Sequence, residues 1–336
     1  MKTNPQTVKR VVLGLGLLAL LIFPFIARNP YQVAIVNMLG LYILMSLGLN
    51  LTQGYCGQIN LALGAFMAVG AYTAALLNTR LGVPIWVNLP LGMVLAGITG
   101  AVIALPMLKV KSHYLALITI GLAETINIVI VNEAWFTEGP LGISGIKMPS
   151  LFGFPINTDQ RFYFLVLIVV VVGYLAARQI TRHRFGRAFV AIRDNEVAAR
   201  AMGVNAAKYQ IISNSICGVY CGAAGVLYAH MSTYISPDIF EFKTALFVLT
   251  MTLIGGMGSL PGSVVGCIMF LGQEYLRAFQ NWQLVGFGVA IMLVVLFMPG
   301  GVMGLTRRLE EVGGLRWRWA RKTREEKPAA GGPHVS

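Results

Sequence analysis

The sequence has few charged residues and lacks the short motifs that identify nucleotide-binding or metal-dependent proteins. Asp, Glu, Lys and Arg make up 12% of its 336 residues, whereas an ordinary soluble domain has about 25%. It contains no G-x-x-x-x-G-K-[ST] sequence, so the chain cannot hold nucleotide phosphates in a P-loop. It also has no H-E-x-x-H motif and no His/Cys cluster with metal-ligand spacing. We therefore expect neither a cofactor nor a metal in this chain.

Cysteine is scarce too, and a catalytic cluster is missing. The four cysteines, Cys56, Cys217, Cys221 and Cys267, all lie in apolar segments, and none belongs to a paired zinc-site spacing. We expect them to be small buried side chains. The apolar segments carry no constellation of polar groups of the kind that an integral-membrane enzyme usually has. An enzyme is therefore a disfavoured class.

Long apolar runs dominate what the sequence does contain. Hydrophobic residues make up 56% of the chain, and ten apolar segments lie at about 11–27, 33–51, 59–78, 85–108, 114–133, 161–180, 210–230, 244–257, 263–279 and 282–298. Because a bilayer core needs about 20 apolar residues per crossing, they predict an all-α, polytopic membrane protein with about ten transmembrane helices in one domain over residues 11–306. The first segment could instead belong to a signal peptide, but no small-x-small cleavage site follows it, so we expect a retained helix.

The basic residues divide unevenly between the loops. With a cytoplasmic N-terminus, residues 1–10, 109–113, 181–209 and the tail 307–336 lie inside, and together with Arg178 they hold 20 of the 26 Lys and Arg. Cytoplasmic loops collect these residues, so both termini are predicted to be cytoplasmic and residues 134–160 to form a periplasmic loop. The net charge of +13 then reflects topology, and no nucleic-acid partner is expected. The tail, partly disordered, would lie at the anionic membrane lipid.

Two glycine-rich junctions resemble each other. LTQGYCGQINLALGAF (51–66) joins the second and third apolar segments, and TLIGGMGSLPGSVVG (252–266) joins the eighth and ninth. In transporters, glycine-interrupted segments at matching places in two halves indicate broken helices around a substrate path. A tight turn at the membrane face is an equally weighted alternative. The candidate path-lining residues at these junctions are Gly54, Gly57, Gln58, Asn60, Gly255, Gly256 and Gly258.

Glu124 lies near the middle of a predicted span. A charge at the membrane centre costs at least about 2.5 kcal/mol unless it is satisfied, so we expect this side chain to face the protein interior. It either lines a translocation path or makes a helix–helix hydrogen bond with its carboxyl group protonated. No chain of acidic residues crosses the spans, which weakens a proton- or sodium-coupled carrier without excluding it.

The longest polar stretch between spans, RFGRAFVAIRDNEVAARAMGVNAAKYQ, covers residues 184–210. From Ala188 it has helical periodicity, Gly203 marks a helix end, and a second helix is expected from about Asn205. The apolar face of the first helix consists of Phe189, Ile192, Val197, Ala201 and Met202. Such a helix either lies on lipid or docks into the groove of a cytoplasmic partner, and its mostly small side chains favour docking.

Within this stretch, Glu196, Ala198, Ala199 and Gly203 form an E-x-A-A-x-x-x-G pattern that resembles the coupling-loop motif of permease subunits in bacterial ABC importers. Its surroundings, together with GYCGQINLALGAFMAVGAYTAALL, GPLGISGI and LIGGMGSLPGSVVG, are similar to the LivM-like branched-chain amino acid permease family over about residues 33–300. The resemblance implies an inner-membrane permease for branched-chain amino acids. The residues that it places at the ATPase contact are Arg184, Gly186, Arg187, Arg193, Glu196, Ala198, Ala199 and Gly203.

The resemblance also implies partners. They are a second, LivH-like permease subunit, two cytoplasmic ATPase subunits that hold ATP and magnesium, and a periplasmic solute-binding protein. The family often has Thr-Gly-Gly in the outer loop, where this chain has Thr137-Glu138-Gly139-Pro140. It also transports urea, short amides and aromatic acids, so the solute stays open. A stand-alone carrier or channel is the alternative class, and it would transport without ATP or partners.

Overall fold

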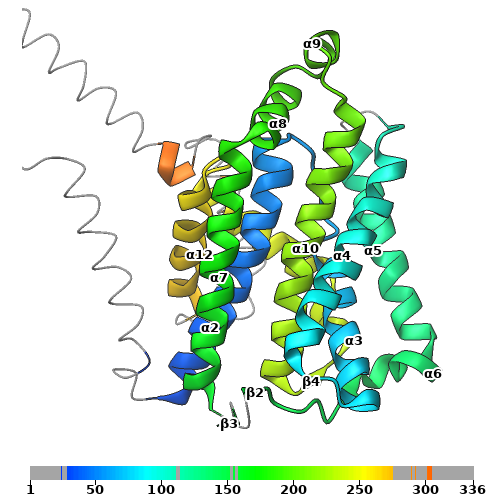
Figure 1. The fold of residues 1–336 in the computed structure, drawn as a ribbon, viewed down its shortest axis with the longest axis vertical. Coiled ribbons are helices and arrows are strands. Elements are labelled where there is room, and N and C mark those ends of the chain that lie inside the picture. Colours follow the sequence, from blue (N-terminus) through cyan, green and yellow to red (C-terminus); the bar gives the residue numbers. More distant parts are fainter. Residues whose placement is uncertain are drawn as a thin grey trace, which may run out of the picture.

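The computed structural model describes residues 29–110, 114–151, 158–274 and 301–304, together with residues 24, 154, 155, 289 and 292. The chain forms a bundle of helices (Figure 1). The predicted N-terminal segment 1–10, the tail 307–336 and almost all of the first and last apolar segments, 11–27 and 282–298, lie outside the described residues.

The other eight predicted apolar segments all contain helix. The helices are α2 (Pro30–Leu49), α3 (Leu63–Leu81), α4 (Ile85–Met107), α5 (Leu115–Asn132), α7 (Asp159–Arg182), α10 (Ala206–Ser232), α11 (Phe242–Gly255) and α12 (Leu260–Glu274). Local sequence signals set two of the helix ends: Pro30 begins α2, and Gly82, with a φ of 65°, follows the last residue of α3. A proline has no amide hydrogen to lose at a helix start, and glycine adopts the left-handed conformation without steric cost.

The number of membrane spans is smaller in the described part of the chain than the predicted ten. Five helices are long and apolar enough to cross a membrane: Tyr31–Tyr55, Ile85–Met107, Leu115–Asn132, Asp159–Arg182 and Ala206–Ser232. A sixth is counted if Pro237–Gly255 and Leu260–Met269, which are bent by 115° at their break, form one broken span or re-entrant loop. The multi-pass helical class therefore holds, while the count of ten stays a prediction.

The segments 244–257 and 263–279 were predicted as two separate spans. The structure shows α11, which has 14 residues, and α12, which is described up to Glu274, on either side of a sharp bend. At 1.5 Å per residue α11 reaches about 21 Å, which is less than the ~30 Å hydrocarbon core. The bend forms where Gly256 and Gly258 have φ angles of 113° and 77°, a conformation that side chains other than glycine rarely adopt.

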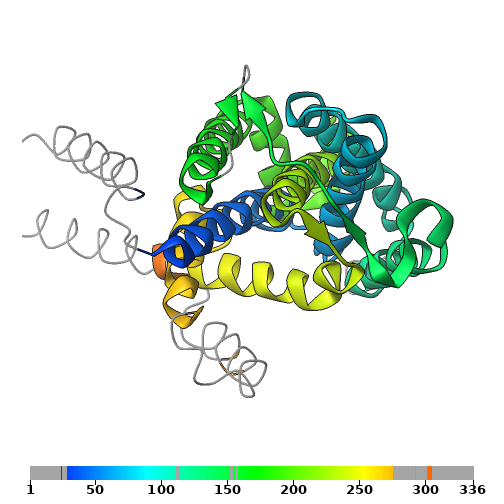
Figure 2. The ribbon, with the colours of Figure 1, turned by 90° about the horizontal axis from the view of Figure 1, so that it is seen from below.

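Helix α10 packs against α2, α3 and α4, and Figure 2 shows it near the centre of the bundle. Small residues allow the close approach. A Cβ atom built on Gly222 would lie 2.5 Å from the Ala96 Cβ and 2.8 Å from the Gly92 oxygen of α4. Glycine at such contacts lets helix backbones pack closely in membranes, where van der Waals contact replaces the hydrophobic drive between helices.

One end of the bundle, here called the α6 end, carries the shorter elements (Figure 1). They are α6 (Ala134–Thr137), η3 (Gly139–Leu141), β1 (Ile143–Ser144), β2 (Ser150–Leu151), β3 (Phe154–Pro155) and β4 (Tyr234–Ile235), while the 3₁₀ helix η4 (Pro237–Phe240) follows β4 and packs on α3. Strand β1 pairs antiparallel with β4, with Ile143 opposite Ile235. In its described part the 134–160 segment is a loop that contains one turn of α-helix, a 3₁₀ turn and short strands.

The opposite end, called the α9 end, carries α8 (Arg184–Asp194) and α9 (Glu196–Ala201) (Figure 1). The single helix predicted from Ala188 is wrong, because Asn195 is extended at φ −161° and its side chain caps α9 by accepting from the Ala198 amide. An asparagine at this position favours a helix start over helix continuation. The helix end at Gly203, which has φ 83°, and the new helix after Asn205 are confirmed.

Candidate functional site

The two glycine-rich junctions, distant in sequence, meet in the structure. Helix α2 continues into a π-helix, η1 (Asn50–Tyr55), and the buried Asn50 side chain reaches across to the bend between α11 and α12. Its amide nitrogen donates to the Ser259 carbonyl at 2.9 Å and to the Ser263 hydroxyl at 2.7 Å. Its oxygen accepts from the Gly258 amide at 2.7 Å. π-Helical turns occur frequently at functional sites, and this one brings both breaks to a single point.

Glycine is required where the junctions touch. A Cβ built on Gly54 would lie 2.5 Å from the Gly258 nitrogen and overlap the Asn50 side chain. The nearest atoms are backbone or already engaged in hydrogen bonds, so the neighbours have little room to move. The turn after η1 and the bend between α11 and α12 are thus packed against each other.

Arg193, the second-last residue of α8, connects the α9 end to this junction. Its Nη1 atom donates to the Gly54 carbonyl at 2.8 Å, while Nε and Nη2 donate to the Asp194 carboxylate at 3.2 and 3.1 Å. Its side chain also packs closely on glycine: a Cβ on Gly57, which has φ 76°, would lie 2.9 Å from the Arg193 Cγ. A Cβ on Gly258 would lie 3.2 Å from Nη1. Arg193 is therefore within contact distance of both junctions.

A buried polar cluster holds the non-helical segment between η1 and α3. The Asn214 amide of α10 donates to the Gln58 side-chain oxygen at 2.6 Å, and the Asn60 amide donates to the Asn214 oxygen at 2.6 Å. Ser213 adds a hydroxyl bond to Gln58 at 3.1 Å, and Thr52 donates to the Ser213 carbonyl at 2.9 Å. Irregular backbone at membrane depth is tolerated only where its polar groups are satisfied. The hydrogen bonds of Gln58 and Asn60 thus stabilise the non-helical segment between η1 and α3.

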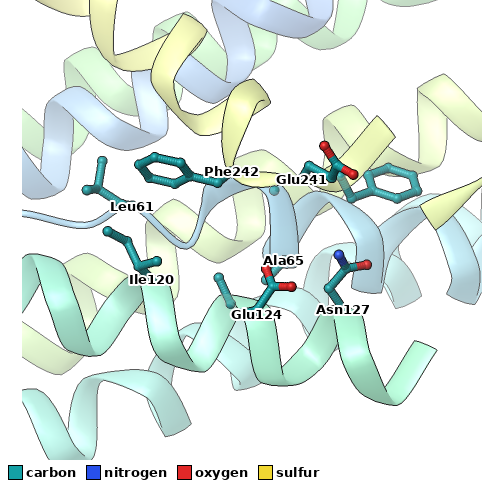
Figure 3. A pocket seen from close by; sticks show the side chains of 10 residues that line it. Leu61, Ala65, Ile120, Glu124, Asn127, Glu241 and Phe242 are labelled. Atoms are coloured by element: carbon teal, nitrogen blue, oxygen red, sulfur yellow. The ribbon is translucent and has the colours of Figure 1, made fainter. Parts of the chain in front are cut away.

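Glu124 lies apart from the junction, in a pocket where α5 faces the start of α3 and of α11 (Figure 3). The pocket is a small depression, and Glu241 lines it together with Glu124. Its apolar wall includes Leu61, Ile120 and Phe242. Within the described chain Glu124 is exposed and makes no hydrogen bond or ion pair. The expectation that it faces the interior of this chain is wrong, because α5 is a peripheral helix.

The α8–α9 segment, residues 184–205, presents only part of its predicted face outward. Val197 and Met202 are 78% and 85% exposed, whereas Phe189 and Ile192 are buried. Glu196 pairs with Arg200 on the surface of α9. The predicted continuous apolar face is therefore wrong: the break at Asn195 turns one half toward the bundle and the other half outward.

The candidate coupling residues divide in the same way. Arg184, Arg187, Ala198 and Gly203 are exposed, and Glu196 is half-buried. Gly186 is buried against the Thr181 backbone, and Ala199 is buried in a cluster with Cys56, Phe189, Ile192 and Ala206. Ala199 thus packs against its own chain and does not offer its side chain to a partner.

Of the predicted residues, the structure brings Gly54, Gly57, Gly258 and Arg193 together, with Gln58 and Asn60 next to them. Gly255 and Gly256 form the bend and pack on Gly262 and Gly301. The sequence reasoning missed Asn50, Ser259, Ser263, Ser213 and Asn214. An available signal was a polar side chain inside an apolar span, next to the glycine motif. Among the described residues no group of three His, Cys, Asp or Glu is placed to hold a metal.

Membrane-length helices around two interlocked helix breaks define the class: a multi-pass α-helical membrane transport protein. The chain belongs to the family described as the permease component of branched-chain amino acid transport systems, whose model matches residues 31–298.

Individual relatives agree with this family. The chain is 31% identical over 328 residues to the high-affinity branched-chain amino acid transport system permease protein LivM of Escherichia coli, covering 90% of this chain and 77% of that protein. It is 24% identical to the probable LivM of Methanocaldococcus jannaschii, covering 79% and 90%. It is 26% identical to LivH of Escherichia coli, covering 78% and 91%. No solved structure gives a significant match.

Proposed function

We propose that this chain is a permease subunit of an ATP-driven importer that carries branched-chain amino acids into the cytoplasm. Family membership over residues 31–298 carries the proposal. The relatives named LivM and LivH are permease proteins of high-affinity branched-chain amino acid transport systems. A chain without a P-loop needs separate ATPase subunits for its energy, so two cytoplasmic ATPases that bind ATP and magnesium, a second permease subunit and a solute-binding protein complete the system.

The α8–α9 segment is the proposed contact with the ATPases. Its outermost part, α9, carries exposed Val197 and Met202 beside a surface ion pair of Glu196 with Arg200. A small apolar tip with a charged rim suits a groove in a protein partner. It would anchor weakly in lipid, because few large apolar side chains point outward. Movement of the ATPases would then enter the permease through α8.

We propose that the solute contacts the translocation path at the Glu124 pocket. On α5, Gly121, Glu124 and Thr125 are exposed on one face, and a carboxylate at the middle of a span cannot face lipid without a cost of at least about 2.5 kcal/mol. We therefore place the second permease subunit opposite this face, with the path between them. Carboxylates of Glu124 and Glu241 would attract an α-ammonium group, and Leu61, Ile120 and Phe242 would contact an aliphatic side chain.

The orientation follows from this assignment. The α9 end would be cytoplasmic, with both termini on the same side, and the α6 end would be periplasmic. The solute-binding protein would then meet the ordered loop of α6, η3 and the short strands. Trp135 and Leu141 of this loop are 77% and 82% exposed, which leaves apolar surface for a partner or for the membrane interface.

Reconstitution tests the function. The chain is purified with its second permease and ATPase subunits, inserted in proteoliposomes, and given binding protein and radiolabelled leucine. We expect uptake that needs enclosed ATP and is competed by valine and isoleucine. A complex whose ATPase lacks its P-loop lysine is the matched control. Uptake by the chain alone without ATP would instead identify a carrier or channel. ATP-driven uptake of urea, acetamide or benzoate without leucine uptake would assign another solute.

A further inference from the structure

Three elements are joined at one point by two side chains. Arg193 connects α8 to η1 through the Gly54 carbonyl at 2.8 Å. Asn50, one turn earlier in η1, connects that helix to the bend between α11 and α12 through three hydrogen bonds of 2.7–2.9 Å. We propose that Asn50 and Arg193 form a link that transmits movement of α8 to both broken helices at once. The proposal rests on the function proposed above and names the residues that perform the transmission inside this chain.

The Gly54 carbonyl is a suitable attachment point. It lies in the last turn of η1, where carbonyl groups have no amide partner further along the helix. The guanidinium group supplies that partner, and a hydrogen bond from a charged donor is about twice as strong as a neutral one. The carbonyl belongs to the backbone, so a shift of Arg193 acts on the helix itself and not on a side chain that can rotate away.

Close packing makes the link stiff. Glycines stand where the three elements meet, at Gly54, Gly57 and Gly258. A Cβ atom at any of them would come within 3.2 Å of Asn50 or Arg193. Packed contacts of this kind switch between discrete arrangements and do not deform gradually. A displacement of α8 must therefore move η1 and the α11–α12 bend, or break the Arg193 bond.

This role differs from contact with an ATPase. The Nη1 atom of Arg193 points inward to Gly54, and the other guanidinium nitrogens bond to its own neighbour Asp194. The Arg193 side chain is 40% exposed, but the most exposed apolar side chains of the segment are Val197 of α9 and Met202 directly after it. Loss of Arg193 should therefore leave binding of the ATPases intact and interrupt the step between ATP hydrolysis and solute movement.

The test measures the coupling ratio, which is leucine taken up per ATP hydrolysed, in the reconstituted complex. Arg193→Met keeps the length and apolar stem of the side chain but removes the donors. Arg182→Met, at the exposed end of α7 on the same side, removes an equal charge and is the matched control. We expect Arg193→Met to retain the ATPase subunits and ATP hydrolysis while its coupling ratio falls about tenfold, a usual size for an allosteric coupling. Arg182→Met should keep the wild-type ratio.

A second variant tests that the two residues act together. Asn50→Ala should lower the coupling ratio in the same way, and the double variant should be no worse than either single one, since residues of one linkage are non-additive. An unchanged ratio in Arg193→Met, a loss of ATPase subunits from it, or additive effects of the two substitutions would each overturn the link. If the wild-type complex itself shows no ATP-driven uptake, the proposed function fails instead, so the two failures are distinct.

Discussion

Asn50 and Gly258 are 208 positions apart in the sequence, yet the Gly258 amide donates a 2.7 Å hydrogen bond to the Asn50 side-chain oxygen. The bond joins the two glycine-rich motifs that the sequence presents as similar but separate. Each motif by itself is a helix break that exposes polar backbone in an apolar region. When the motifs meet, the Asn50 side chain of one satisfies backbone hydrogen-bonding groups of the other. This explains why both interruptions persist within a membrane domain.

The orientation of the bundle can be measured by cysteine labelling. In a version without the four native cysteines, Val197→Cys and Trp135→Cys place thiols at the α9 end and the α6 end, at positions that are 78% and 77% exposed. A membrane-impermeant maleimide should label Trp135→Cys in intact cells and Val197→Cys only after permeabilisation, because the basic loops favour a cytoplasmic α9 end. The reverse pattern would contradict the predicted topology.

Substitution of Glu124 should impair uptake without preventing assembly. Glu124→Ala removes a carboxylate from the pocket, and we expect uptake to fall about tenfold, as for loss of one hydrogen bond to a charged group. Glu133→Ala is the control: it removes an exposed carboxylate from the end of the same helix, where it accepts a bond from the Trp135 indole. Wild-type uptake by Glu124→Ala would mean that the carboxylate is dispensable.

Neighbouring alanines in α9 should respond differently to a large side chain. Ala198 is exposed and Ala199 is buried against Phe189 and Ile192. Ala199→Trp should lower the thermal stability of the purified chain itself, at an overpacking cost of about 1–3 kcal/mol. Ala198→Trp should leave that stability unchanged and reduce co-purification of the ATPase subunits. Equal recovery of the ATPases by Ala198→Trp and wild type would move the docking surface away from α9 and favour a helix that lies on lipid.

The stability of the buried polar cluster around Gln58 and Asn60 should fall when Asn214 is replaced. Asn214→Leu removes one of the two donors to the Gln58 oxygen, which keeps the Ser213 hydroxyl, and leaves the Asn60 amide without its 2.6 Å acceptor. Each unsatisfied buried group costs about 1–3 kcal/mol, so the midpoint of thermal unfolding in detergent should drop clearly. Thr99→Val removes only an exposed bond to the preceding turn of its own helix and should have little effect. Similar midpoints for both variants would show that the cluster contributes nothing to stability.

The sequence alone determined the class of the protein and much of its local structure. Apolar segment length placed eight helices close to their observed positions, because a run of this length and polarity has few alternatives to a helix in lipid. Gly203 ended a helix and Asn205 began one, since both depend on local backbone conformation and capping. The glycine motifs marked the two places where the helical path is interrupted, and the coupling-loop pattern led to the family that residues 31–298 match.

Tertiary structure decided which of these pieces meet. Periodicity grouped Phe189, Ile192, Val197 and Met202 on one apolar face, but the Asn195 break buries the first two and exposes the others. Hydropathy counted α11 and α12 as two spans, while the structure bends them by 115° at their break, as in a broken span or a re-entrant loop. The resemblance placed Arg193 at the ATPase contact, and the structure adds a bond from its side chain to Gly54, 139 positions away. Residue type and spacing fix the local conformation of the chain. Which polar groups bond to each other across the bundle depends on how the helices pack, because lipid cannot satisfy these groups.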